Sequence, residues 1–110
     1  MISSDVIRGH IDTIILKLLM EKDMYGYEIA GEITARTNDK FQIKEATLYA
    51  VVGRLENREL ITSYVGEKTH GGKRRYYRVT PLGRAYYQEL IKEWDLLRSI
   101  MKDMLGSENE

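Results

Sequence analysis

The chain has 110 residues, no cysteine, and seventeen basic side chains balanced by seventeen acidic ones. This length fits one compact domain, and the absence of cysteine excludes a disulfide framework and thiolate metal sites. The first five residues lack the basic and apolar segments of a secretory signal, and apolar runs such as Ile14-Ile15-Leu16 are too short to span a membrane, so we expect a cytoplasmic protein.

The charges are unevenly distributed along the chain. Residues 40–78 hold nine Lys and Arg against four acidic residues, whereas the rest of the chain has an excess of acid. A basic segment between acidic flanks is typical of proteins that contact nucleic acid, although an ordinary solvated cluster gives the same count.

Two helices are predicted in the first third of the chain. Isoleucines and leucines recur at helical spacing over residues 5–21, where Ser3 or Ser4 can cap the start. A second helix is expected over residues 25–36, ended by the turn-forming pair Asn38-Asp39. Gly26 near its start would let another backbone come close.

A third helix is predicted over residues 45–57. Its buried stripe consists of Leu48, Val51, Val52 and Leu55. Lys44 stands at the capping position, and lysine is a poor cap. The helix therefore begins with unpaired amide donors and a cation, a combination that favours an anion.

A β-hairpin and a long final helix complete the predicted elements. Strands are expected over residues 61–65 and 74–80, joined by a loop over 66–72 in which Gly71 and Gly72 tolerate positive φ. Thr80 can cap the last helix and Pro81 suits its first position, which places this helix over residues 81–104.

The last helix carries apolar residues spaced 3, 4, 3, 4 and 3 apart. They are Tyr87, Leu90, Trp94, Leu97, Met101 and Met104. This spacing is the seam of a coiled coil, and no later element follows to cover it, so we expect a homodimer. Residues 106–110 alone look like a disordered tail.

Three helices followed by a glycine-turned hairpin predict an α+β, mostly α fold, the winged helix-turn-helix. It would occupy residues 1–80, with residues 81–105 as an added dimerisation helix in the same compact unit. In this fold the third helix enters the major groove and the hairpin tip contacts the adjacent DNA backbone or the minor groove. The side chains expected to contact double-stranded DNA are Lys44, Thr47, Tyr49, Arg54, Lys73, Arg74 and Arg75.

The sequence bears on two other functional classes. A winged-helix module that dimerises and binds a protein instead of DNA remains an alternative. An enzyme is not predicted, because the sequence offers no nucleophile–base pair and no spaced set of metal ligands, and no cofactor is expected.

Several ordered motifs resemble the PadR-like family of transcriptional regulators. They are Tyr25-Gly-Tyr-Glu-Ile29, Ala46-Thr-Leu-Tyr49, Arg54-Leu-Glu56, Leu60-Ile61, Gly71-Gly-Lys-Arg-Arg-Tyr-Tyr-Arg-Val-Thr80 and Leu82-Gly83. The resemblance covers about residues 8–94 and is closest to the compact subfamily and its multidrug-binding repressors. It implies a homodimer swapped through its first and last helices, a palindromic operator, and release from DNA by small aromatic molecules.

Trp94 has two interpretations. It can pack the dimer seam, since a large aromatic side chain buries much apolar area, or it can stack on a flat ligand held between the subunits. In the second case the expected neighbours are Ile91, Asp95, Arg98, Ile11, Asp12 and Ile15.

Three positions depart from the family pattern. Ala50 stands where relatives often have proline, so the third helix is expected to continue smoothly. Glu59 replaces a glycine, and we expect Asn57 to take the left-handed conformation there instead. Arg98 occupies the place of an acidic residue that holds cationic drugs, so a preference for cations is not carried over.

Overall fold

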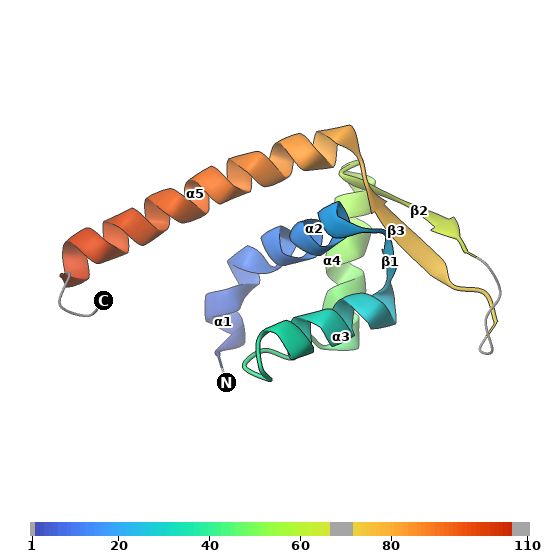
Figure 1. Cartoon of the computed structure of the whole chain (residues 1–110), viewed down its shortest axis with the longest axis horizontal. Helices are drawn as coiled ribbons and strands as arrows, with labels where there is room; N and C mark the ends of the chain where they lie inside the picture. The colour runs from blue at the N-terminus through green and yellow to red at the C-terminus, as the bar shows by residue number, and fades with distance from the viewer. Residues whose placement is uncertain (1, 67–71, 107–110) are drawn as a thin grey trace.

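A computed structural model describes residues 2–66 and 72–106 of the chain (Figure 1). The expected winged-helix arrangement is confirmed, with helices packed against a small antiparallel sheet and a long C-terminal helix. Most of the expected loop 66–72 and of the expected tail 106–110 lies outside the described residues. The elements are α1 (Ser4–Ile7), the 3-10 helix η1 (Arg8–His10), α2 (Ile11–Glu21), β1 (Met24–Tyr25), α3 (Gly26–Arg36), α4 (Glu45–Asn57), β2 (Ile61–Val65), β3 (Arg75–Val79) and α5 (Pro81–Leu105).

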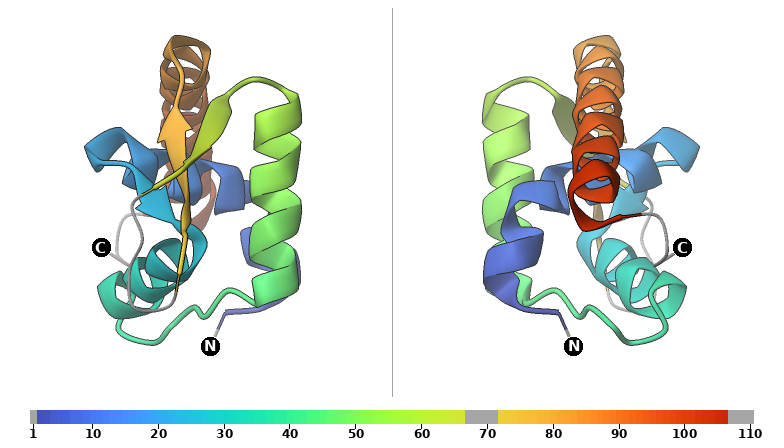
Figure 2. Two further views of the ribbon diagram at one scale, coloured as in Figure 1. Left: turned by 90° about the vertical axis from the view of Figure 1, so that its right-hand side faces the viewer. Right: turned by 90° about the vertical axis from the view of Figure 1, so that its left-hand side faces the viewer.

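The hydrophobic core lies around α2. Ile15 and Leu16 of this helix are completely buried, and they share one core cluster with Ile29 of α3 and Leu55 of α4. Figure 2 shows α3 and α4 on different sides of this centre. Each such side chain contributes about 1.5–3 kcal/mol when it leaves water, so the core fixes how the helices are placed.

The sheet has three strands in the order β1-β3-β2, all antiparallel. Tyr77 of β3 is paired with Ser63 of β2 on one side and with Met24 of β1 on the other. Tyr77 and Val79 are buried while Arg78 between them is exposed, as expected from the period of two in a strand.

The first helix is not continuous, contrary to the prediction over residues 5–21. It is interrupted by η1, and His10 adopts φ −118° and ψ −1°, away from helical values. Gly9 lies in this interruption, and glycine is a poor helix former because its backbone loses more conformational freedom on ordering. The expected serine cap is confirmed, since Ser3 Oγ accepts a hydrogen bond from the amide of Asp5 at 3.1 Å.

The end of α4 corrects a second prediction. Asn57 remains helical, and Glu59 itself takes the left-handed conformation at φ 61°. The amide of Leu60 donates to Leu55 O at 3.0 Å and the amide of Glu59 donates to Glu56 O at 2.9 Å. These two bonds form a Schellman motif, which requires the left-handed residue one position after the helix cap, Arg58.

The predicted start of α5 is confirmed. Thr80 caps the helix by accepting a hydrogen bond from the amide of Gly83 at 3.0 Å, and Pro81 occupies the first turn. The Thr80 hydroxyl also donates to Glu59 O at 2.8 Å, and a methyl group at Gly83 would collide with the Leu60 carbonyl oxygen. These contacts attach the start of α5 to the end of α4.

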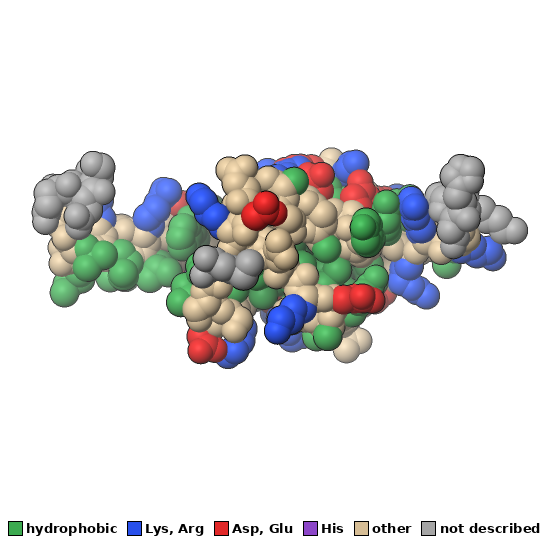
Figure 3. Space-filling view, turned by 90° about the horizontal axis from the view of Figure 1, so that it is seen from below, with side chains coloured by type: hydrophobic (Ala, Val, Ile, Leu, Met, Phe, Trp, Pro, Cys, Tyr) green, Lys and Arg blue, Asp and Glu red, His purple; other side chains and the backbone are tan. Residues whose placement is uncertain are grey.

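From this attachment α5 crosses α2, and its C-terminal half extends beyond the body of the protein (Figure 1). Along this extended half Trp94, Leu97, Met101 and Met104 are all exposed. Figure 3 shows hydrophobic side chains gathered on this protruding end. Within residues 2–66 and 72–106, no helix combines the length and the hydropathy needed to cross a lipid bilayer.

Candidate nucleic-acid interface

The outward face of α4 is made of small residues. Successive helical residues turn by about 100°, which places Ala46, Ala50 and Gly53 opposite the buried stripe. Ala46 and Ala50 are exposed, and a methyl group at Gly53 would meet no atom within 4 Å. A helix with so small an outer surface can approach the floor of a groove closely.

Tyr49 and Thr47 lie on opposite flanks of that small face. Tyr49 is 47% exposed, and its hydroxyl lies over Gly26 at the start of α3, where an added methyl group would come within 2.5 Å of it. Gly26 therefore makes room for the Tyr49 side chain, whereas its sequence position suggested the close approach of another backbone. Lys44 precedes the helix and makes no side-chain capping bond, as predicted.

A cleft of about 560 Å³ separates the start of α3 from the hairpin. It is lined by Tyr25, Gly26, Tyr27, Tyr49, Lys73, Arg74, Arg75 and Tyr77. Of these described residues three are cations and none is acidic, so the cleft attracts an anion. Tyr27 is 82% exposed and was not among the predicted contacts, although it belongs to the Tyr25–Ile29 motif.

The basic residues of the hairpin are held by different partners. The Arg74 guanidinium lies 4.3 Å from the centre of the Tyr25 ring, and Arg75 Nη1 donates to Ser63 Oγ at 3.0 Å. Arg78 instead forms an ion pair with Asp23 at 2.9 Å. Burial raises the pKa of Asp23, but hydrogen bonds from Tyr64 and Arg78 outweigh burial and hold that pKa below its usual value.

The structure directs Arg54 away from this cleft. Its Nη2 donates to Asp12 Oδ1 of α2 at 2.7 Å, so the guanidinium that was expected on DNA forms an ion pair within the protein. Tyr49, Lys73, Arg74 and Arg75 meet around the cleft. Lys44 and Thr47 line a different cavity, beside α1.

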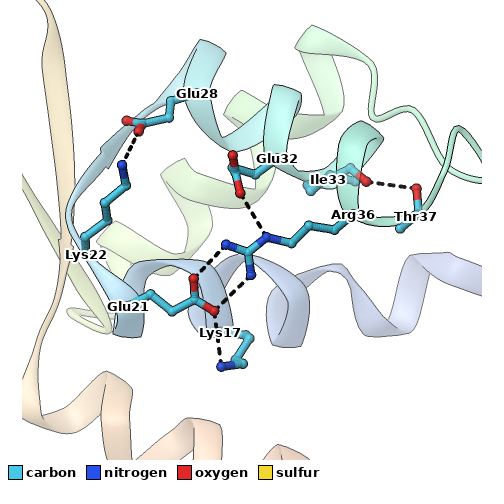
Figure 4. A network of polar contacts seen from close by, with 8 residues as sticks. All are labelled: Lys17, Glu21, Lys22, Glu28, Glu32, Ile33, Arg36 and Thr37. Carbon is cyan, nitrogen blue, oxygen red and sulfur yellow. Dashed lines mark hydrogen bonds and ion pairs between the residues drawn. The ribbon is translucent and has the colours of Figure 1, made fainter.

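A network of ion pairs joins α2 to α3 (Figure 4). Arg36 donates to both carboxylate oxygens of Glu21, at 2.7 and 2.9 Å, and its Nε donates to Glu32 at 2.8 Å. Lys17 contacts Glu21 at 3.2 Å. Hydrogen bonds from Arg36 and then Lys17 lower the pKa of Glu21 to about 2. The network links α2 to α3 at the surface of the protein.

An apolar cavity of about 410 Å³ lies beside Trp94. Its walls are Ile7, His10, Thr13, Ile14, Lys17, Leu18, Arg36, Tyr87, Ile91 and Trp94. Trp94 is 43% exposed, and the His10 ring meets it edge-on with the ring centres 5.6 Å apart. The volume is within the range of small-molecule sites.

Only part of the predicted ligand set surrounds this cavity. Ile91 lines it, whereas Ile11 and Ile15 are buried in the core and Asp12 is paired with Arg54. The α2 face toward Trp94 carries Thr13, Ile14 and Lys17 instead, because Ile11 and Ile15 lie on the face of the same helix that packs into the core. Asp95 and Arg98 pair with each other at 3.4 Å outside the cavity walls.

Comparisons with known proteins settle the family. Residues 15–89 match the model of the transcriptional regulator PadR-like family. The chain belongs to this family. An uncharacterized protein of Lysinibacillus sphaericus is 60% identical over 101 residues, which are 92% of this chain and 93% of its own.

Two solved structures are similar to this PadR-like chain. A transcriptional regulator from Clostridium thermocellum is 48% identical, with a TM-score of 0.88 over 96% of this chain and all of its own. PadR of Bacillus subtilis, solved in complex with operator DNA, is 19% identical, with a TM-score of 0.68 over 77% of this chain and 48% of its own. The second likeness shows a shared fold.

Proposed function

We propose that this PadR-like regulator is a homodimer that represses transcription by binding a two-fold symmetric operator through α4 and the β2–β3 hairpin. The observation that carries the proposal is the basic cleft, in which three hairpin cations face the start of α3 and Tyr49 of the recognition helix. A relative of the same fold, PadR of Bacillus subtilis, was solved on operator DNA.

The hairpin and α4 make different kinds of contact with DNA. Lys73, Arg74 and Arg75 neutralise phosphates beside the groove, while α4 enters the groove along its small face of Ala46, Ala50 and Gly53. Phosphate contacts supply most of the affinity, and contacts of Thr47 and Tyr49 with base edges supply the selection.

The dimer follows from the exposed seam of α5. A helix surface that combines Trp94, Leu97 and Met101 in the open is costly in water, and a second copy presents the same apolar surface to cover it. The two recognition helices would then lie about one turn of DNA apart, roughly 34 Å.

The DNA interface is tested by salt dependence. A duplex selected from a random pool is titrated against the native protein and against a variant with Lys73→Gln and Arg75→Gln, which spares the packing of Arg74 on Tyr25. Loss of two phosphate contacts should lower the salt slope by about 2 and the affinity at 100 mM salt by about tenfold or more. The matched control, Arg84→Gln with Lys92→Gln on α5, removes the same charge away from the cleft and should change neither.

Equal effects of the two double variants would reject the interface, and a selection that enriches no symmetric site would reject the operator. A protein that dimerises but shows only salt-independent or no DNA binding would favour the alternative, a module that binds protein.

We further propose that a small aromatic effector enters the cavity beside Trp94 and releases the dimer from DNA. It can act only by binding the released state more tightly than the DNA-bound state. Titration with 1-naphthol, followed by Trp94 fluorescence and by operator affinity, tests this. Quenching without any change in operator affinity would remove the regulatory role.

A further inference from the structure

A second cavity, distinct from the one beside Trp94, lies between α1 and the start of the recognition helix. Its volume is about 390 Å³. One wall is α1 with the first turn of α2, and the other is the segment that leads into α4. The amide of Ile2 donates to Lys40 O at 3.3 Å, which holds the beginning of the chain across this segment.

Half of the lining is apolar. These side chains are Ile2, Ile7, Ile11, Phe41 and Ile43. Ile11 is buried, while the other four are exposed or half-buried and face the cavity with hydrocarbon. A DNA phosphate or a free inorganic anion would leave these apolar side chains exposed to water, so the lining fits a molecule with an apolar body.

The rest of the lining donates hydrogen bonds and carries positive charge. It consists of Ser4, Arg8, Gln42, Lys44 and Thr47, and no Asp or Glu is among the ten lining residues. Two cations at the edge of an apolar cavity, with the Asp5 carboxylate that pairs with Arg8 outside the lining, match the charge of an anionic head group.

Arg8 can reach such a head group at little cost. It donates one hydrogen bond to Asp5 at 2.9 Å, in a pair whose side chains are 72% and 81% exposed. Ion pairs this exposed stabilise a protein by little, and the guanidinium has further N–H donors for a ligand.

We propose that this cavity binds an amphipathic carboxylate, with the apolar tail among the isoleucines and Phe41 and the carboxylate between Arg8 and Lys44. The site lies within one chain and is separate from the Trp94 cavity. Lys44 and Thr47 also belong to the proposed DNA-contacting surface, so a bound carboxylate would neutralise Lys44 and weaken operator binding. This last step rests on the proposed function.

The experiment uses octanoate as the probe and the full chain with isotope-labelled isoleucine methyl groups. The two cavities are distinguished by their own isoleucines, since Ile2, Ile11 and Ile43 line this one while Ile14 and Ile91 line the other. Saturable shifts of the first three methyl groups are expected. Shifts confined to Ile14 and Ile91, or no saturable shifts, would overturn the proposal.

The role of charge is tested with ligands and with variants. Octan-1-ol and octylamine, which keep the tail but lack the carboxylate, should bind at least about threefold more weakly than octanoate. Arg8→Gln should weaken octanoate binding about threefold to tenfold, and Asp5→Asn should strengthen it because it removes the competing carboxylate. Arg84→Gln on α5 is the matched control and should have no effect. Equal binding of all three ligands, or equal effects of Arg8→Gln and Arg84→Gln, would overturn the assignment.

These measurements need no DNA, so their outcome is independent of whether the chain binds an operator. A separate titration of the selected duplex, with and without saturating octanoate, tests the regulatory step. Weaker duplex binding in octanoate by the native protein, and a smaller effect for Arg8→Gln, is expected. Unchanged duplex affinity at saturation would overturn the regulatory step.

Discussion

Arg54 of the recognition helix forms an ion pair with Asp12 of α2 at 2.7 Å, with the Asp12 side chain only 17% exposed. The pair holds α4 against the central helix at the flank opposite Tyr49.

The Asp12–Arg54 pair should contribute modestly to stability. Asp12→Asn is expected to lower the free energy of unfolding by about 0.5–1 kcal/mol, because half of the Arg54 side chain is in water and solvent screens the attraction. Urea denaturation of Asp12→Asn, Arg54→Gln and the double variant, at one protein concentration, gives the coupling directly. Additive effects of the two single changes would show that the ion pair contributes nothing.

The ion-pair network of Figure 4 should make stability depend on pH. The folded pKa of Glu21 is about 2, below the ordinary value of 4.5. The network therefore contributes fully above about pH 5 and loses its contribution as the pH falls toward 2. Melting temperatures of the native protein and Glu21→Gln should differ most above pH 5 and converge near pH 2.

Glu93→Gln, on the exposed face of α5, is the control for that titration and should show no such convergence. A gap between the native protein and Glu21→Gln that stays constant from pH 7 to pH 2 would contradict the role of the carboxylate.

The left-handed conformation of Glu59 predicts a stabilising substitution. A residue with a Cβ atom is strained at φ 61°, and glycine is not, although glycine makes the unfolded chain more flexible. Glu59→Gly should raise the free energy of unfolding by about 0.5–1 kcal/mol in urea denaturation. Asn38→Gly, at φ 51°, is the comparison and should gain less, because asparagine tolerates this region better. A loss of stability in Glu59→Gly would contradict the prediction.

The seam of α5 predicts a dimer that one charge can weaken. Native protein should sediment at twice the chain mass of 12.8 kDa. Leu97→Glu places a charge in the seam and should weaken dimerisation by about tenfold or more, because the carboxylate must lose its water. Leu82→Glu, an exposed leucine at the other end of α5, should leave the dimer intact. A native monomer would reject the homodimer.

Much of the fold could be predicted because its signals are local. The cap at Thr80-Pro81 and the stripe of α4 are visible within a few residues of sequence. β1 is different, since two residues carry no periodicity and Met24 becomes a strand only by pairing with Tyr77 of β3. The left-handed conformation of Glu59 was also not predicted. The two Schellman hydrogen bonds require this conformation at the first residue after the helix cap, whichever residue stands there.

The sites were predicted less completely for a related reason. The cations Lys73–Arg75 and Tyr49 meet at one cleft, as their places in the winged helix suggest. Which face of α2 meets Trp94, however, depends on how α2 packs in the core, which takes up Ile11 and Ile15, so Ile14 and Lys17 line the cavity in their place. The place of Tyr27 at the cleft and the pairing of Arg54 with Asp12 depend on contacts between distant segments. The spacing of residues in the sequence does not predict such contacts.

Ile7 lines both the cavity beside Trp94 and the cavity beside Lys44. Because Ile7 is a shared wall, a ligand in one cavity that displaces this side chain toward the other cavity reduces the volume left for a second ligand. Antagonism of this kind is reciprocal, so each ligand must weaken the affinity of the protein for the other ligand by the same factor. The regulator would then respond to two different ligands, an aromatic effector and an amphipathic carboxylate, through the position of Ile7.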